Sequence, residues 1–99
     1  MAKMKVSPEG YAIFRCPGCN GNHRLHVKIN GEALLPEPCW DWNGSLDTPT
    51  FTPSLRIQWN YGDGDEQCHS NVTEGKIGFH GDSTHALKGQ TVDLPEWED

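Results

Sequence analysis

Apolar and polar residues alternate along several short stretches of this chain, the pattern of strands with one buried face. The clearest case is residues 23–29, where one face carries Leu25, Val27 and Ile29 and the other carries Arg24, His26 and Lys28. Further β-prone runs cover residues 11–15, 54–60, 68–73, 76–80 and 91–94. Helical periodicity is nearly absent, because residues 85–88 allow only one helical turn before Gly89. The pattern predicts an all-β or β-rich small domain.

Turn-forming residues separate these runs and indicate how they pair. Residues 16–21 are rich in turn-forming residues and predict a hairpin whose turn carries two cysteines. Glu74-Gly75 predicts a second hairpin, and Asn30-Gly31 and residues 61–66 predict further turns. We therefore expect antiparallel strands, with Ile77 and Phe79 pointing inward.

Residues 36–53 form a proline-rich stretch that is expected to be a long ordered loop. Its four prolines exclude a regular central strand or a helix interior across most of that length. The same stretch carries Trp40, Trp42 and Phe51, which is too many aromatic rings for a flexible linker. We expect these rings to cover the core from the outside.

The composition predicts one small domain whose fold a bound metal ion would help to stabilise. The chain has 99 residues, of which 34% are apolar, with 11 glycines and 7 prolines, so its hydrophobic core must be modest. A single domain over residues 1–99 is expected, with flexible ends at about 1–10 and 96–99.

Net charge and hydropathy indicate which classes of binding partner and which cellular compartment to expect. The net charge is −6 and the basic residues never cluster, which disfavours nucleic acid as a partner. No apolar run is long enough to cross a bilayer and no signal-type stretch follows Met1, so we expect no membrane association and a cytoplasmic protein. Cytosolic thiols stay reduced, and the four cysteines are therefore interpreted as metal ligands rather than disulfides.

Cys16-Pro17-Gly18-Cys19 has the spacing of a zinc knuckle, in which a tight turn presents two thiolates on one side. The rival interpretation is a redox dithiol, but such pairs begin a helix in a βαβ unit, and here a strand pattern follows. The sequence predicts a structural Zn²⁺ held by Cys16 and Cys19.

A closed zinc site needs two more ligands. Cys68 opens the second predicted hairpin and is the expected third ligand, whereas Cys39 is interpreted as a small buried residue. His85, in a turn, is the favoured fourth ligand, and the alternatives are His69 and His23. Cys68 and His69 are neighbours, so a regular strand would point them to opposite faces. The remaining candidates are Asp82, expected to orient a ligating ring, and His26 and His80, interpreted as polar side chains that face solvent.

Read in order, several segments resemble a known family. They are Cys16-Pro17-Gly18-Cys19 with His23, Trp42-Asn43-Gly44, Pro49-Thr50-Phe51-Thr52-Pro53-Ser54, Cys68-His69, and Asp82-Ser83-Thr84-His85-Ala86-Leu87 with Gly89. The chain resembles, from about Phe14 to Trp97, a small phage and bacterial zinc-binding-like domain family of unknown function. The resemblance brings forward His23, Cys68, His69, Asp82 and His85, and its pattern lacks Cys39.

The resemblance implies a phage or bacterial protein, in the host cytoplasm if phage-encoded, but it supplies no reaction. Members of the family are often labelled ammonia monooxygenase, and some similar bacterial domains are encoded beside ubiquitin-like conjugation genes. We reject the oxygenase label, because no membrane span is present and a thiolate-rich site suits zinc better than copper or iron.

Two functions follow as hypotheses. The first is a non-enzymatic, zinc-stabilised accessory module that binds a host protein through the loop carrying Trp40, Trp42 and Phe51. The alternative is a zinc-dependent hydrolase, in which His69, Asp82 or Glu66 assists a metal-bound water. Its variant uses a second, His-rich site of His23, His69 and His85.

Overall fold

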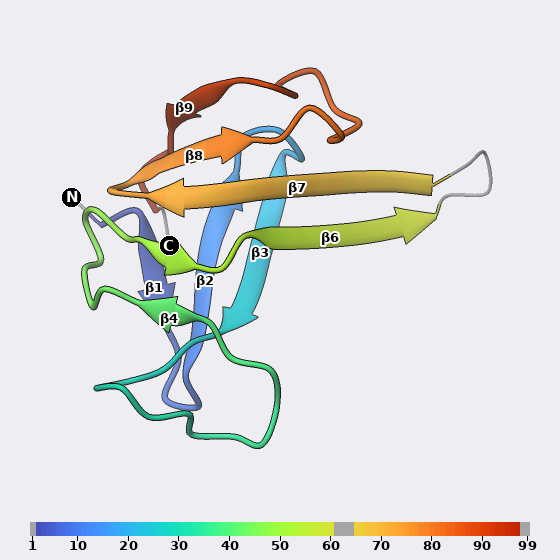
Figure 1. The fold of residues 1–99 in the computed structure, drawn as a ribbon. Coiled ribbons are helices and arrows are strands. Elements are labelled where there is room, and N and C mark those ends of the chain that lie inside the picture. Colours follow the sequence, from blue (N-terminus) through green and yellow to red (C-terminus); the bar gives the residue numbers. More distant parts are fainter. Residues whose placement is uncertain (1, 61–64, 98–99) are drawn as a thin grey trace.

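The computed structural model of the protein describes residues 2–60 and 65–97 (Figure 1). The strands, in chain order, are β1 (Met4–Val6), β2 (Tyr11–Cys16), β3 (Gly21–His26), β4 (Asp41–Trp42), β5 (Phe51–Thr52), β6 (Leu55–Asn60), β7 (Asp65–Thr73), β8 (Lys76–Phe79) and β9 (Thr91–Asp93). They form sheets of order β1-β2-β3, β4-β5 and β6-β7-β8-β9, all antiparallel. The predicted all-β fold is confirmed, and the described residues contain no helix.

The two predicted hairpins are both present. β2 and β3 pair from Tyr11–His26 to Cys16–Gly21, so the turn between them carries the cysteine knuckle. β7 and β8 meet at Glu74 and Gly75, which both have positive φ values, of 52° and 80°. Glycine adopts this backbone conformation without steric cost, which explains the turn. The turn predicted at 61–66 lies partly outside the described residues, and residues 65 and 66 begin β7.

The core lies between the three-stranded and the four-stranded sheet. In Figure 1 the strands β6 to β8 cross β2 and β3 at a steep angle. The inner faces meet in one hydrophobic cluster, to which β2 contributes Phe14, β7 contributes Val72, and β8 contributes Ile77 and Phe79. Ile77 and Phe79 point inward as predicted. Sequence reasoning did not predict β1, which adds the buried Met4 to the same cluster.

The proline-rich stretch is an ordered loop that contains the two short strands β4 and β5. Trp40 and Trp42 pack partly buried against the core, as expected, but Phe51 is buried inside the core rather than covering it from the outside. The indole N–H of Trp40 donates a hydrogen bond to the backbone carbonyl of Ser54, at 3.3 Å. The loop therefore fixes the backbone at the start of β6.

One expectation about the strand faces is wrong. His26 was expected on the polar face, but its side chain is only 3% exposed. β3 ends at His26, and Val27 instead forms an isolated bridge to Trp40, so the alternation of the strand stops there. His80 is exposed, as predicted.

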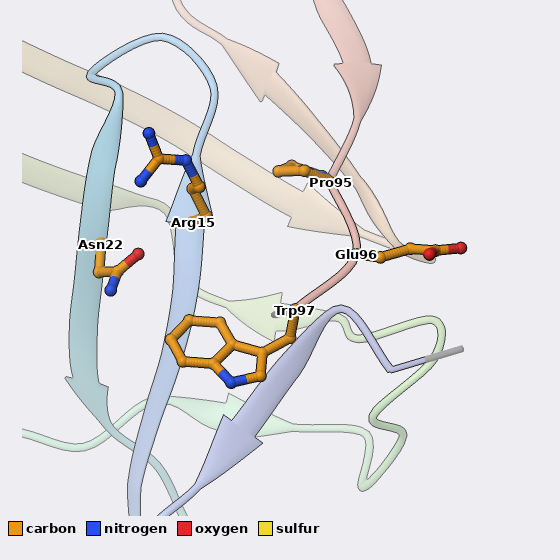
Figure 2. Close-up of a pocket in the computed structure, with 5 residues that line it drawn as sticks. All are labelled: Arg15, Asn22, Pro95, Glu96 and Trp97. Carbon is orange, nitrogen blue, oxygen red and sulfur yellow. The ribbon is translucent and has the colours of Figure 1, made fainter. Parts of the chain in front are cut away.

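A cavity of about 500 Å³ lies between the three-stranded sheet and the segment that follows β9 (Figure 2). It is lined by Arg15, Asn22, Pro95, Glu96 and Trp97. The backbone N–H of Trp97 donates to the carbonyl of Ala2, which ties the tail to the segment before β1. None of the residues predicted for the functional site lines this cavity.

Candidate functional site

Four of the predicted metal ligands come together between the two sheets. Cys16 ends β2, Cys19 lies in the following turn, Cys68 lies on β7, and His85 lies in the turn after β8. One ligand atom from each lies within 4.8 Å of the other three. The Sγ atoms of Cys16 and Cys68 are 3.9 Å apart. Two thiolates on a tetrahedral zinc with bonds of about 2.3 Å would be about 3.8 Å apart, so the cluster could hold a metal ion.

His85 reaches this cluster because the knuckle has no side chain at Gly18. A Cβ atom built on Gly18 would lie 2.3 to 2.7 Å from atoms of the His85 ring, which no real contact tolerates. The Nε2 atom of His85 is buried and has no hydrogen-bond partner among the described residues. A buried ring nitrogen without a partner is costly unless it binds a metal, so His85 fits the role of fourth ligand.

The electrostatics of the thiols also favour a cation. The hydrogen bond from Cys68 lowers the pKa of Cys16 to about 4, against the opposing effect of burial, and His23 lowers it further. Burial and the Cys16 thiolate raise the pKa of Cys19 to about 11. The hydrogen bond to Cys16, followed by burial, raises the pKa of Cys68. Without a cation the cluster thus supports one thiolate, and a divalent metal would stabilise all three.

The other candidate ligands lie outside the cluster. His23 is buried beside Cys16 and supports its thiolate. Cys39 is partly buried in the loop, where its thiol contacts the carbonyl of Trp40 at 3.9 Å. His69 and Asp82 contact each other on the opposite face of β7 and take part in a different arrangement.

That arrangement is a hydrogen-bonded chain of a serine, a histidine and an aspartate. The hydroxyl Oγ of Ser54 lies 3.2 Å from Nε2 of His69. The other ring nitrogen of His69, Nδ1, lies 3.1 and 3.2 Å from the two carboxylate oxygens of Asp82. One tautomer of His69 satisfies both contacts: Nδ1–H donates to Asp82, and Nε2 accepts from the Ser54 hydroxyl. A nucleophile, a base and a group that orients the base have this geometry.

The hydrogen-bonded series of Ser54, His69 and Asp82 is open to solvent on the outer face of the four-stranded sheet. The side chain of His69 is 22% exposed and that of Asp82 is 55% exposed. Burial would raise the pKa of Asp82, but the hydrogen bond from His69 and its charge outweigh burial and hold that pKa below its usual value. Asp82 is therefore ionised at neutral pH, as a carboxylate that orients an imidazole must be.

Ser83 and Gln67 fix the position of Asp82 against β7. The buried hydroxyl of Ser83 accepts from the backbone N–H of His69 and donates to the His69 carbonyl, both at 3.0 Å. The side-chain amide of Gln67 donates to the carbonyl of Asp82 at 3.2 Å. The turn that carries Asp82 is thus bound to the strand that carries His69.

The sequence pattern indicates His69 and Asp82 as site residues but gives no sign of Ser54 or Ser83. Ser54 follows a proline at the start of an alternating run, and no glycine-rich nucleophile motif surrounds it. A Ser–His–Asp arrangement is recognised by geometry rather than by spacing, so the sequence offered no signal for Ser54.

The fold and the site define a small antiparallel β domain with a Ser–His–Asp site on one face of a strand and a candidate metal centre on the other. The chain belongs to the family described as bacterial ubiquitination-like system serine protease (BubE), whose model matches residues 1–80. The matched span includes Ser54 and His69 and ends before Asp82 and His85. Neither the curated proteins nor the solved structures contain a match.

The family overturns the predicted function. A non-enzymatic accessory module is wrong, because the family is described as a serine protease. The alternative, a zinc-dependent hydrolase, is not supported either, since His69 and Asp82 contact Ser54 and each other rather than the cluster. The resemblance to a bacterial family is confirmed in part, and a ubiquitination-like system suggests protein partners. The described part of the chain has no helix long and apolar enough to cross a bilayer.

Proposed function

We propose that the protein is a serine protease in which Ser54 is the nucleophile, His69 the general base and Asp82 the carboxylate that orients the base. The observation that carries the proposal is the continuous contact from Ser54 Oγ through both nitrogens of His69 to Asp82. The family description supports it independently. The proposed substrate is a protein of a bacterial ubiquitination-like system.

In the proposed mechanism each of the three residues has a step. Ser54 Oγ attacks the carbonyl carbon of the scissile peptide bond, and its proton passes to Nε2 of His69. His69 then gives this proton to the leaving amine, which leaves an ester between the substrate acyl group and Ser54. A water molecule that loses a proton to His69 then attacks the ester, and His69 returns this proton to Ser54 Oγ as the acid product leaves. Asp82 holds Nδ1–H and stabilises the imidazolium formed in each half of the reaction.

The metal centre is proposed to be a structural zinc site. Cys16, Cys19, Cys68 and His85 supply three sulfur ligands and one nitrogen ligand, the set that zinc favours in closed sites. The bound ion would supply a cross-link between the two sheets. Cys68 and His85 lie within three residues of His69 and Asp82 along the chain, so the same link would hold both in place.

The test is covalent labelling with a fluorophosphonate probe, which reacts with activated serines. We expect the purified full chain to be labelled at Ser54, as located by mass spectrometry. S54A should abolish labelling, and H69A should reduce it by at least about 1000-fold. T52A, at an exposed position two residues before the nucleophile, is the matched control and should label normally. An unlabelled wild-type protein, or labelling that survives S54A, would overturn the proposal.

A further inference from the structure

Asn71 lies on β7 near the proposed nucleophile, at the same end of the β6–β7 ladder. The ladder between β6 and β7 ends with Leu55 opposite Ser70, and Ser54 precedes the one residue as Asn71 follows the other. Ser70 is buried and points into the core, so Asn71, the next residue, is exposed on the outer face, two residues beyond His69. Asn71 is therefore exposed on the same face of the sheet as His69, whose ring contacts the Ser54 hydroxyl.

A hydrogen bond to His80 fixes which end of this amide is free. Nε2 of His80 lies 2.6 Å from Oδ1 of Asn71. Oδ1 carries no hydrogen, so His80 donates and the acceptor end of the amide is occupied. No described residue accepts a hydrogen bond from the Nδ2 group of Asn71. Its two N–H donors are available on the same face as Ser54.

His80 also connects Asn71 to the proposed base. Its ring lies parallel to the ring of His69, with centroids 3.9 Å apart and an interplanar angle of 9°. The backbone N–H of His80 donates to the carbonyl of His69, at 2.8 Å. One side chain thus packs on the base and holds the Asn71 amide on the same face of the sheet, so His80 is a positioning residue for both.

We propose that Asn71 donates a hydrogen bond from Nδ2 to the oxyanion of the tetrahedral intermediate, an inference that rests on the proposed serine protease function. When Ser54 Oγ bonds to the carbonyl carbon, the π electron pair moves onto the carbonyl oxygen and creates a negative charge. A pre-oriented N–H beside that oxygen stabilises the transition state more than the ground state, and no proton leaves Asn71. Loss of one such donor typically costs about 100- to 1000-fold in rate.

The experiment measures the rate of fluorophosphonate labelling for Asn71 variants of the full chain. The phosphoryl oxygen of the probe gains charge as Ser54 attacks and tests the same donor. N71A should lower the maximal labelling rate by about 100- to 1000-fold and leave the half-saturating probe concentration nearly unchanged. T73A, the next outward residue on β7, is the matched control and should label like the wild type.

The N71D variant distinguishes a role of Asn71 as an oxyanion donor from a role in anchoring His80. Aspartate keeps the oxygen that accepts from His80 but has no N–H for the oxyanion. If Asn71 acts as the oxyanion donor, N71D labels at least as slowly as N71A while its thermal melt stays at the wild-type temperature. Recovery of the wild-type rate in N71D would assign Asn71 to anchoring His80 and overturn the inference. A normal rate in N71A would overturn it too.

The labelled wild type keeps the two proposals distinguishable. If wild-type Ser54 is labelled and both Asn71 variants are labelled equally fast, only the oxyanion inference fails. If wild-type Ser54 is not labelled, the serine protease proposal itself fails.

Discussion

Cys68 and His69 are adjacent on β7 and face opposite sides of the sheet. Cys68 is 1% exposed and its Sγ lies in the thiol cluster between the sheets, whereas the ring of His69 lies on the outer face against Ser54 and Asp82. The alternation of a regular strand produces this division. A metal ion in the cluster would therefore lie on the opposite side of β7 from the proposed base. Because one peptide bond joins Cys68 to His69, loss of order at the metal site should also displace the His69 ring.

The first prediction concerns Asp82. D82N keeps the size of the side chain, but an amide can donate to Nδ1 of His69 and so favours the tautomer that cannot accept from Ser54. We expect the fluorophosphonate labelling rate to fall about 1000- to 10,000-fold with little change in the thermal melt. D93N, which alters an exposed aspartate on the edge strand β9, is the control. A D82N protein that labels at the wild-type rate would show that the carboxylate does not orient the base.

The second prediction concerns metal removal. A strong chelator that strips the cluster should abolish cooperative thermal unfolding, because the small core cannot keep the two sheets together without the link. Labelling of Ser54 should disappear in parallel, although no metal ligand belongs to the proposed catalytic chain. Circular dichroism, metal analysis and labelling on the same samples test both expectations. An unchanged melt after verified metal loss would contradict the structural role.

Strand patterning predicted most of the fold, because the buried residues of this chain lie on alternating positions. Residues 54–60, 76–80 and 91–94 became β6, β8 and β9 with small shifts at their ends. β1 was missed because a run of three residues carries too little periodicity to stand out. The burial of His26 was missed for a different reason. The strand alternation ends there because the next residue, Val27, forms a β-bridge to Trp40 in the proline-rich loop, and local periodicity does not predict that contact.

The two parts of the site differ in how far the sequence could predict them. Metal ligands have strong chemical identity and recurring spacing, so Cys16, Cys19, Cys68 and His85 could be proposed before their proximity was known. The nucleophile is one of several ordinary serines, and only the register of β6 against β7 and the turn after β8 set it beside His69 and Asp82. Long-range pairing carries this information, and local sequence does not.

The third prediction separates the cysteines. C68S should reduce the zinc content of the purified protein to well below one ion per chain, because a neutral hydroxyl replaces a thiolate that lies 3.9 Å from the Sγ of Cys16. C39S should retain the full content, since Cys39 lies outside the cluster. Elemental analysis of both variants beside the wild type is the measurement. Loss of zinc in C39S with retention in C68S would mean that the ligand set is wrong.

The fourth prediction concerns the protons that metal binding releases. At pH 7 the metal-free cluster should contain one thiolate, because the pKa of Cys16 is lowered to about 4 and that of Cys19 is raised to about 11. The pKa of Cys68 is also raised, so Cys19 and Cys68 must each lose a proton when a divalent metal binds. We expect about two protons per ion, measured by calorimetry in two buffers that differ in ionisation enthalpy. Between pH 6 and pH 8 the affinity should therefore weaken by about 100-fold for each unit of acidification. Release of three protons at pH 7 would show that the Cys16 thiol is not ionised in advance, and release of none would contradict the ionisation of Cys19 and Cys68 on metal binding.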